Sequence, residues 1–162
     1  MYAFTVICKS PRDTGIVASM IAPVLRQGDA IILNGDLAAG KTYFVQALVG
    51  ALGSSSKVTS PTFGLAHFYG TDAGMFLHVD AYRLSSVAEY RDLGLTEYSV
   101  TSITAVEWGE KIENEFSDFL SIQFDFIENN DTFRRLTLSS GTDRWKQALQ
   151  QVQCQLLKEL DA

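Results

Sequence analysis

The feature that most constrains this chain is the segment NGDLAAGKTYF, residues 34–44. Its spacing, Gly-x-x-x-x-Gly-Lys-Thr, is typical of a loop whose inward-turned backbone N–H groups bind phosphate. In such a loop the lysine, here Lys41, reaches the β- and γ-phosphates, and the threonine hydroxyl, here Thr42, ligates Mg²⁺. The alternative is an ordinary glycine-containing turn with a solvated lysine, so the flanking sequence decides between the two.

Both flanks favour a strand, a turn and a helix. Upstream, residues 30–34 (AIILN) form a short apolar run that predicts a buried strand. Downstream, apolar residues recur with the spacing of one helix face before Gly53, and these are Phe44, Val45, Leu48, Val49 and Leu52. A helix N-terminus carries partial positive charge and favours a bound phosphate. We therefore interpret the segment as a nucleotide-phosphate loop.

The rest of the chain alternates between strand and helix patterns. Strands are predicted at residues 2–7, 65–69, 75–82, 102–108, 120–127 and 133–139. Helices are predicted after Ser10, over residues 85–95 and from Asp143 onward, and residues 53–64 predict a loop. The expected fold class is α/β, with a P-loop NTPase-like central mixed β-sheet flanked by helices and a C-terminal antiparallel hairpin and helix. No repeat or linker is evident, so we expect residues 1–162 to form a single ATP-binding domain.

Composition narrows the class of protein. Apolar residues make up 46% and charged residues 20% of the chain, which is typical of globular proteins. The sequence shows neither a membrane-span pattern nor a signal-peptide layout at its start, so we expect a cytoplasmic protein without a membrane partner. The net charge of −6 argues against sequence-independent binding of nucleic acid. Cys8 and Cys154 lack metal or redox spacing and are expected to be reduced, buried thiols.

Two carboxylates follow apolar strand patterns. Asp80 ends MFLHVD and Glu107 ends SITAVE, and strand-end acids near a phosphate loop bind metal and help to place water. The alternative for each is a turn cap or an ion pair. Trp108 is expected either to border the nucleotide or to anchor the core. His78 is expected to lie behind the metal ligands and not among them, because Mg²⁺ prefers oxygen.

Five segments together resemble one family. They are GDLAAGKTYF, SPTF, HVDAYRL, LGLTEY and EWGE, which occur in this order between residues 35 and 110. This set resembles the TsaE family, the bacterial ATPases needed to make threonylcarbamoyladenosine in tRNA. The resemblance extends from about Thr14 to Glu110.

The resemblance implies a role for specific positions. The phosphates of ATP would be bound by Gly35, Asp36, Leu37, Ala38, Ala39, Gly40 and Lys41. Mg²⁺ would be held by Thr42 and Glu107, with Asp80 as the family's strand acid, so that Lys41, Asp80 and Glu107 are the catalytic candidates. Residues 59–62, including Thr62, would sense the γ-phosphate. Thr14, Trp108 and Arg134 would lie beside the nucleotide.

The sequence departs from the family at a few positions. Ala38 stands where the loop commonly has glycine, and an alanine is accommodated there without strain if that position has a negative φ. Tyr43 replaces a second threonine after Thr42, and a proline that often follows EWxE is missing.

The resemblance also implies partners. It implies that ATP hydrolysis resets a complex of the TsaD and TsaB proteins, and that tRNA is reached only through these partners. Two alternatives share the same loop: a small-molecule kinase, which the scattered arginines disfavour, and a non-hydrolysing adaptor that binds ATP or ADP, which the two strand-end acids disfavour.

Overall fold

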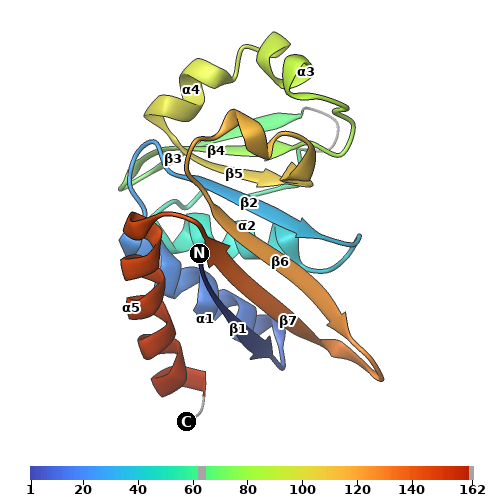
Figure 1. Ribbon diagram of the computed structural model, residues 1–162, viewed down its shortest axis with the longest axis vertical. Helices are drawn as coiled ribbons and strands as arrows, with labels where there is room; N and C mark the ends of the chain where they lie inside the picture. The colour runs from blue at the N-terminus through green and yellow to red at the C-terminus, as the bar shows by residue number, and fades with distance from the viewer. Residues whose placement is uncertain (62–64, 161–162) are drawn as a thin grey trace.

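A twisted β-sheet forms the centre of the protein (Figure 1), which we describe from a computed structural model at residues 1–61 and 65–160. Within these residues the sheet has seven strands, in the spatial order β1-β7-β6-β2-β5-β4-β3. The strands are β1 (Tyr2–Cys8), β2 (Ala30–Gly35), β3 (Ala66–Thr71), β4 (Gly74–Asp80), β5 (Ile103–Glu107), β6 (Leu120–Ile127) and β7 (Asn130–Ser140). The helices are α1 (Pro11–Ile21), α2 (Lys41–Ala51), α3 (Val87–Asp92), α4 (Thr96–Thr101) and α5 (Asp143–Leu160), with 3₁₀ turns η1 (Ala22–Val24), η2 (Gly109–Lys111) and η3 (Glu113–Glu115).

The centre of the sheet is parallel and its edges are antiparallel. β2 pairs in parallel with β5 and β6, and β4 pairs in parallel with β5. β3 runs antiparallel to β4 at one edge, while β7 and β1 extend the other edge in antiparallel pairs. Because parallel strands end on the same side of a sheet, the carboxyl ends of β2, β4 and β5 meet there. The predicted fold class is thereby confirmed.

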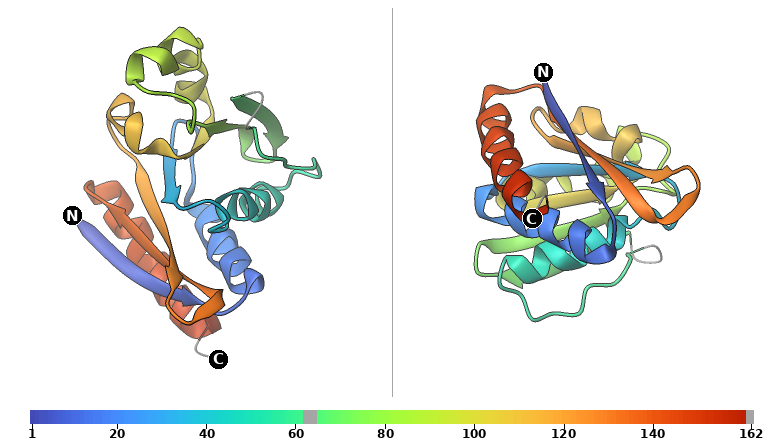
Figure 2. Two further views of the ribbon diagram at one scale, coloured as in Figure 1. Left: turned by 90° about the vertical axis from the view of Figure 1, so that its right-hand side faces the viewer. Right: turned by 90° about the horizontal axis from the view of Figure 1, so that it is seen from below.

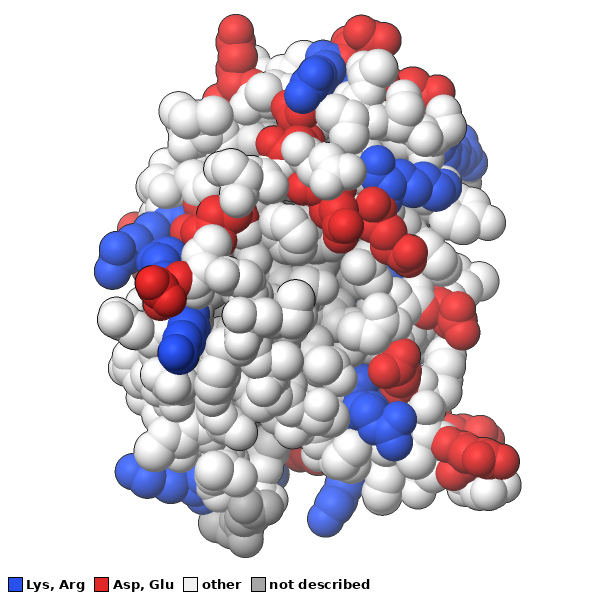
Figure 3. All heavy atoms as spheres, in the orientation of Figure 1, with Lys and Arg blue, Asp and Glu red and all other residues white. Residues whose placement is uncertain are grey.

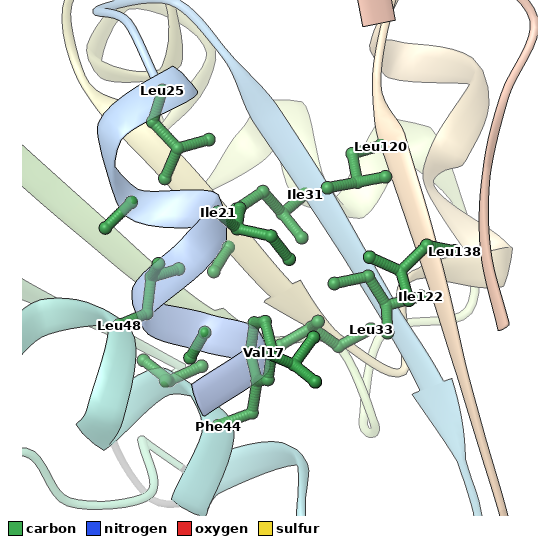
Figure 4. Close-up of a cluster of buried hydrophobic side chains, with 14 of the residues drawn as sticks. Val17, Ile21, Leu25, Ile31, Leu33, Phe44, Leu48, Leu120, Ile122 and Leu138 are labelled. Carbon is green, nitrogen blue, oxygen red and sulfur yellow. The ribbon is translucent and has the colours of Figure 1, made fainter. Parts of the chain in front are cut away.

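Helices cover the two faces of the sheet unequally. α1, α2 and α5 pack on one face, and α3, α4 and η2 lie over the other face of β2, β4 and β5 (Figure 2). Figure 4 shows the larger core, in which α1 and α2 contribute Val17, Ile21, Phe44 and Leu48 opposite Leu33 and its neighbours from the sheet. Burial of each such side chain stabilises the fold by about 1.5–3 kcal/mol. This core fixes α2, and therefore the loop that precedes it.

Helix α1 begins where the sequence predicts. The hydroxyl of Ser10 accepts a hydrogen bond from the backbone N–H of Asp13 at 3.3 Å, and the Asp13 carboxylate accepts one from the N–H of Lys9 at 2.7 Å. The first bond is an N-cap contact, and the second ties the residue before the cap to the first turn of the helix.

Three local predictions differ from the structure. The β4 run was expected to continue to residue 82 but ends at Asp80, because the N–H of Tyr82 turns back to the Asp80 carboxylate. The short helix α4 was not predicted. Cys8 is buried as expected, but Cys154 is exposed because it lies on the solvent face of α5.

No helix in the described part of the chain combines the length and the apolar character needed to cross a bilayer.

Candidate active site

Three strand ends surround one cavity. The loop that follows β2, Asp80 at the end of β4 and Glu107 at the end of β5 converge there, since Glu107 is in register with both Leu33 and Asp80. The cavity has a volume of about 350 Å³. Its lining residues are Leu37, Ala38, Ala39, Gly40, Lys41, Thr42, Tyr43, Ser60, Asp80, Tyr82, Glu107 and Trp108. Most of the sequence-predicted site residues are thus brought together by the sheet.

Glycine is required at two positions of the loop for different structural reasons. A Cβ atom on Gly35 would lie 2.5 Å from the carbonyl oxygen of Phe124, so the close approach of β6 excludes a side chain. Gly40 has a φ of 108° and forms the start of α2 in the left-handed region. Only glycine adopts that backbone freely, so both positions of the motif are dictated by the loop's path.

Ala38 does not meet the condition for an unstrained alanine. Its φ is +64°, in the left-handed region, and not negative. The backbone of the loop therefore keeps the conformation suited to glycine, and the alanine methyl carries a strain of roughly 1–2 kcal/mol.

Lys41 is held inside the loop that precedes it. Its side chain is buried, and Nζ donates hydrogen bonds to the carbonyl oxygens of Gly35 at 2.5 Å and Asp36 at 2.8 Å. Burial lowers the pKa of Lys41, while the nearby charges of Glu107, Asp80 and Asp36 act to raise it. The ammonium group is therefore placed at the cavity wall, and Asp36 contributes to the site through its carbonyl group while remaining exposed itself.

Glu107 is fixed by two hydrogen-bond donors. Its Oε1 accepts one bond from the Thr42 hydroxyl and one from His78 Nε2, both at 2.8 Å. His78 is fully buried, so it reaches the cavity only through Glu107. A carboxylate held in this way presents a defined orientation to the cavity.

Asp80 lies at the cavity and also caps a turn. It lines the cavity, and its Oδ1 also accepts a hydrogen bond from the N–H of Tyr82 at 2.9 Å, as a turn cap does. Both it and Glu107 are almost fully buried. Together with the Thr42 hydroxyl they form a set of oxygen donors, which is the ligand type that Mg²⁺ prefers.

A second cavity, of about 220 Å³, also adjoins the phosphate loop and is lined by Thr14 and Arg134 among others. Thr14 lines it from α1. Arg134 lies in β7 and donates from Nε to the carbonyl oxygen of Ala39 at 3.2 Å. The structure therefore places both residues next to the loop, although they are far from it in the sequence.

Trp108 borders the first cavity. Its backbone is left-handed, with φ 58° and ψ 38°, which is rare for a bulky residue. Its ring contacts that of Tyr82, with 5.1 Å between centroids.

Residues 59–62, the segment predicted to sense the γ-phosphate, are only partly within the described residues. Ser60 lines the cavity, whereas Thr62 lies outside the described residues. Tyr82 was missed by the sequence reasoning, and its position two residues after a strand-end acid is the signal that could have found it.

Comparisons with known proteins identify the family of this chain. Residues 8–136 match the family described as Threonylcarbamoyl adenosine biosynthesis protein TsaE. The TsaE protein of Streptomyces coelicolor is 39% identical over 134 residues, covering 79% of this chain and 90% of that protein. The TsaE protein of Treponema pallidum is 35% identical over 114 residues, covering 70% and 84% respectively.

A solved structure has the same fold. The crystal structure of YdiB from Bacillus subtilis superimposes with a TM-score of 0.79 at 25% identity, and covers 95% of this chain and 96% of that one. On these grounds the chain belongs to the TsaE family of threonylcarbamoyladenosine biosynthesis proteins.

Proposed function

We propose that this protein binds ATP together with Mg²⁺ at the phosphate loop and hydrolyses it during the threonylcarbamoyladenosine modification of tRNA. The observation that carries the proposal is the convergence of Lys41, Thr42 and Glu107 on one cavity at the carboxyl ends of parallel strands. This is where α/β proteins bind ligands.

Different groups of the chain would bind different parts of the nucleotide. The amides of the loop and the ammonium of Lys41 would bind the phosphates, because they supply positive charge in a chain whose net charge is −6. The cavity lined by Thr14 and Arg134 adjoins the same loop and offers room for the nucleoside part. Ser60 also lines the first cavity, and the segment that contains it would sense the γ-phosphate.

The residues present fit a magnesium ion. The described residues contain no group of three or more His, Cys, Asp or Glu side chains arranged to hold a metal. A nucleotide-bound Mg²⁺ needs fewer protein ligands, because phosphate oxygens and waters complete its shell. Thr42, Glu107 and Asp80 would hold it, and the ion would supply positive charge to the phosphate oxygens. Glu107, oriented by Thr42 and His78, would also orient water near the terminal phosphate.

We further propose that tRNA is reached through the TsaD and TsaB proteins, on which this protein would act. Acidic side chains gather over the end of the molecule that carries α3, α4 and the turns after β5 (Figure 3). Such a surface repels a phosphate backbone, so a partner would have to contact the nucleic acid.

Calorimetry and phosphate release together test the proposal. Lys41→Ala should lose ATP affinity. Glu107→Ala should still bind ATP with a modest loss, but phosphate release with TsaD and TsaB present should fall about a hundredfold or more, the scale for losing one preorganised electrostatic group. The proposal fails if Lys41→Ala binds ATP normally or if Glu107→Ala turns over at the wild-type rate. Phosphorus NMR of the products separates hydrolysis from phosphoryl transfer by a kinase.

A further inference from the structure

The indole ring of Trp108 lies against the ammonium group of Lys41. Nζ is 4.1 Å from the ring centroid, and the lysine side chain is 4% exposed. A cation over the face of an aromatic ring is attracted by the ring's quadrupole, most strongly for tryptophan and more strongly where water is excluded. The contact therefore belongs to the stronger class of such pairs.

The ring is held in this place by its backbone and by a neighbouring ring. The N–H of Trp108 donates to the carbonyl oxygen of Leu33 at 2.9 Å, which ties the residue to β2 just before the phosphate loop. From there the left-handed backbone directs the side chain toward the cavity. Tyr82 packs edge-on against the indole, with an interplanar angle of 61°. A strained backbone that is retained beside a cavity is a common feature of functional sites.

We propose that Trp108 is a positioning residue, which holds the Lys41 ammonium in place for phosphate through this cation–π contact. The inference rests on the proposed function of the loop. The carbonyl groups of Gly35 and Asp36 accept hydrogen bonds from the ammonium, and the indole face covers a further side of it. A lysine stem has many rotamers, so fixing it before the ligand arrives reduces the entropy lost on binding. Trp108 therefore acts on phosphate through Lys41.

Fluorinated tryptophans at position 108 test the contact without changing the shape of the side chain. Successive fluorine atoms withdraw charge from the ring face and weaken its attraction for a cation. We expect the dissociation constant for ADP, measured by calorimetry in EDTA, to rise stepwise from tryptophan to tetrafluorotryptophan, by about threefold to tenfold in total. An unchanged or tightened affinity across the series overturns the inference.

Position 145 provides a matched control. The buried Trp145 also has a cation over its ring, the Arg144 guanidinium at 4.1 Å, away from the cavity. The same fluorinated series at position 145 should leave ADP affinity unchanged. An equal loss there would show a general effect of fluorination and would contradict the inference.

Lys41→Ala separates this inference from the proposed function. In that variant the series at position 108 should have no further effect on ADP affinity, since the cation is gone. If Lys41→Ala binds ADP normally, both the proposed function and the inference fail. If Lys41→Ala loses ADP affinity while the fluorinated series in the wild type leaves it unchanged, only the role of Trp108 fails.

NMR of the nucleotide-free protein gives a spectroscopic readout. The Lys41 ε-methylene protons should be shifted upfield by the indole ring, and they should lose this shift in Trp108→Leu.

Discussion

One carboxylate oxygen links three parts of the chain in this protein. Glu107 Oε1 accepts hydrogen bonds from Thr42, at the start of α2, and from His78, inside β4. Since a carboxylate only accepts, His78 donates from Nε2, and its Nδ1 has no hydrogen-bond partner among the described residues. The imidazole thus orients the acid that we propose to act on metal and water.

Replacement of His78 should affect both stability and metal-dependent binding. His78→Leu removes one donor from a buried carboxylate, which should lower the free energy of unfolding by about 1–3 kcal/mol and reduce the gain in ADP affinity that Mg²⁺ provides. His78→Gln keeps an N–H donor and should lose less of both. Urea unfolding and calorimetry with and without Mg²⁺ measure these effects; equal losses in the two variants would show that only the shape of the imidazole matters.

The left-handed Ala38 predicts a stabilising substitution. Ala38→Gly removes the strain of a methyl group at φ 64°, at the cost of a more flexible unfolded chain, and should raise the free energy of unfolding by about 0.5–1 kcal/mol. Ala39→Gly is the matched control, because Ala39 is buried and is not among the described residues with positive φ. Ala39→Gly should lower the free energy of unfolding measured by urea denaturation. A loss of stability in Ala38→Gly would contradict the strain.

Helix α5 shows that the spacing of apolar residues predicts which side chains of a helix are buried. Trp145, Leu149, Val152 and Leu156 recur along one side and are buried, as their spacing predicts. The same period puts Cys154 on the opposite side, where it is exposed. Its burial was expected because it lacks metal or redox spacing, but its position on the helix places it on the exposed face.

The two thiols should therefore differ in reactivity. Burial raises the pKa of Cys8 from its ordinary value of 9.0 to about 11, so at pH 8 its thiolate is about a hundredfold scarcer than that of an ordinary cysteine. Iodoacetamide at pH 8 should label Cys154 and leave Cys8 unmodified until the protein unfolds, as mass spectrometry of the peptides can show. In Cys154→Ser the native protein should remain unlabelled, and rapid labelling of Cys8 would contradict its burial.

For the whole molecule, the distribution of charge makes a prediction about tRNA. With a net charge of −6 and acidic side chains over one end (Figure 3), the isolated protein should show no binding of tRNA at about 0.15 M salt, because phosphate contacts dominate such affinity. Filter binding with the isolated protein measures this directly, and the TsaD–TsaB complex serves as a positive control. A micromolar complex of tRNA with this protein alone would contradict the proposed indirect contact.

Much of the fold could be predicted from the sequence because its signals are local. The strand of residues 120–127 and the helix start at Ser10 follow from apolar period and capping chemistry, which involve neighbouring residues. The short α4 was missed because a single turn and a half of helix carries little periodic signal.

Patterns in the amino-acid sequence are enough to predict the glycine-lysine motif of the loop, the type of each long element and the two acids at strand ends. The tertiary structure alone decided which groups meet: His78 behind Glu107, the indole of Trp108 over Lys41, and Arg134 beside the carbonyl group of Ala39, 95 residues away in the chain. It also decided that Ala38 keeps a glycine-like backbone. The physical reason is one of range. Hydrogen bonds within a turn or helix act between near neighbours and leave a pattern in the sequence, whereas strand order and side-chain packing join distant residues according to the shape of the whole core.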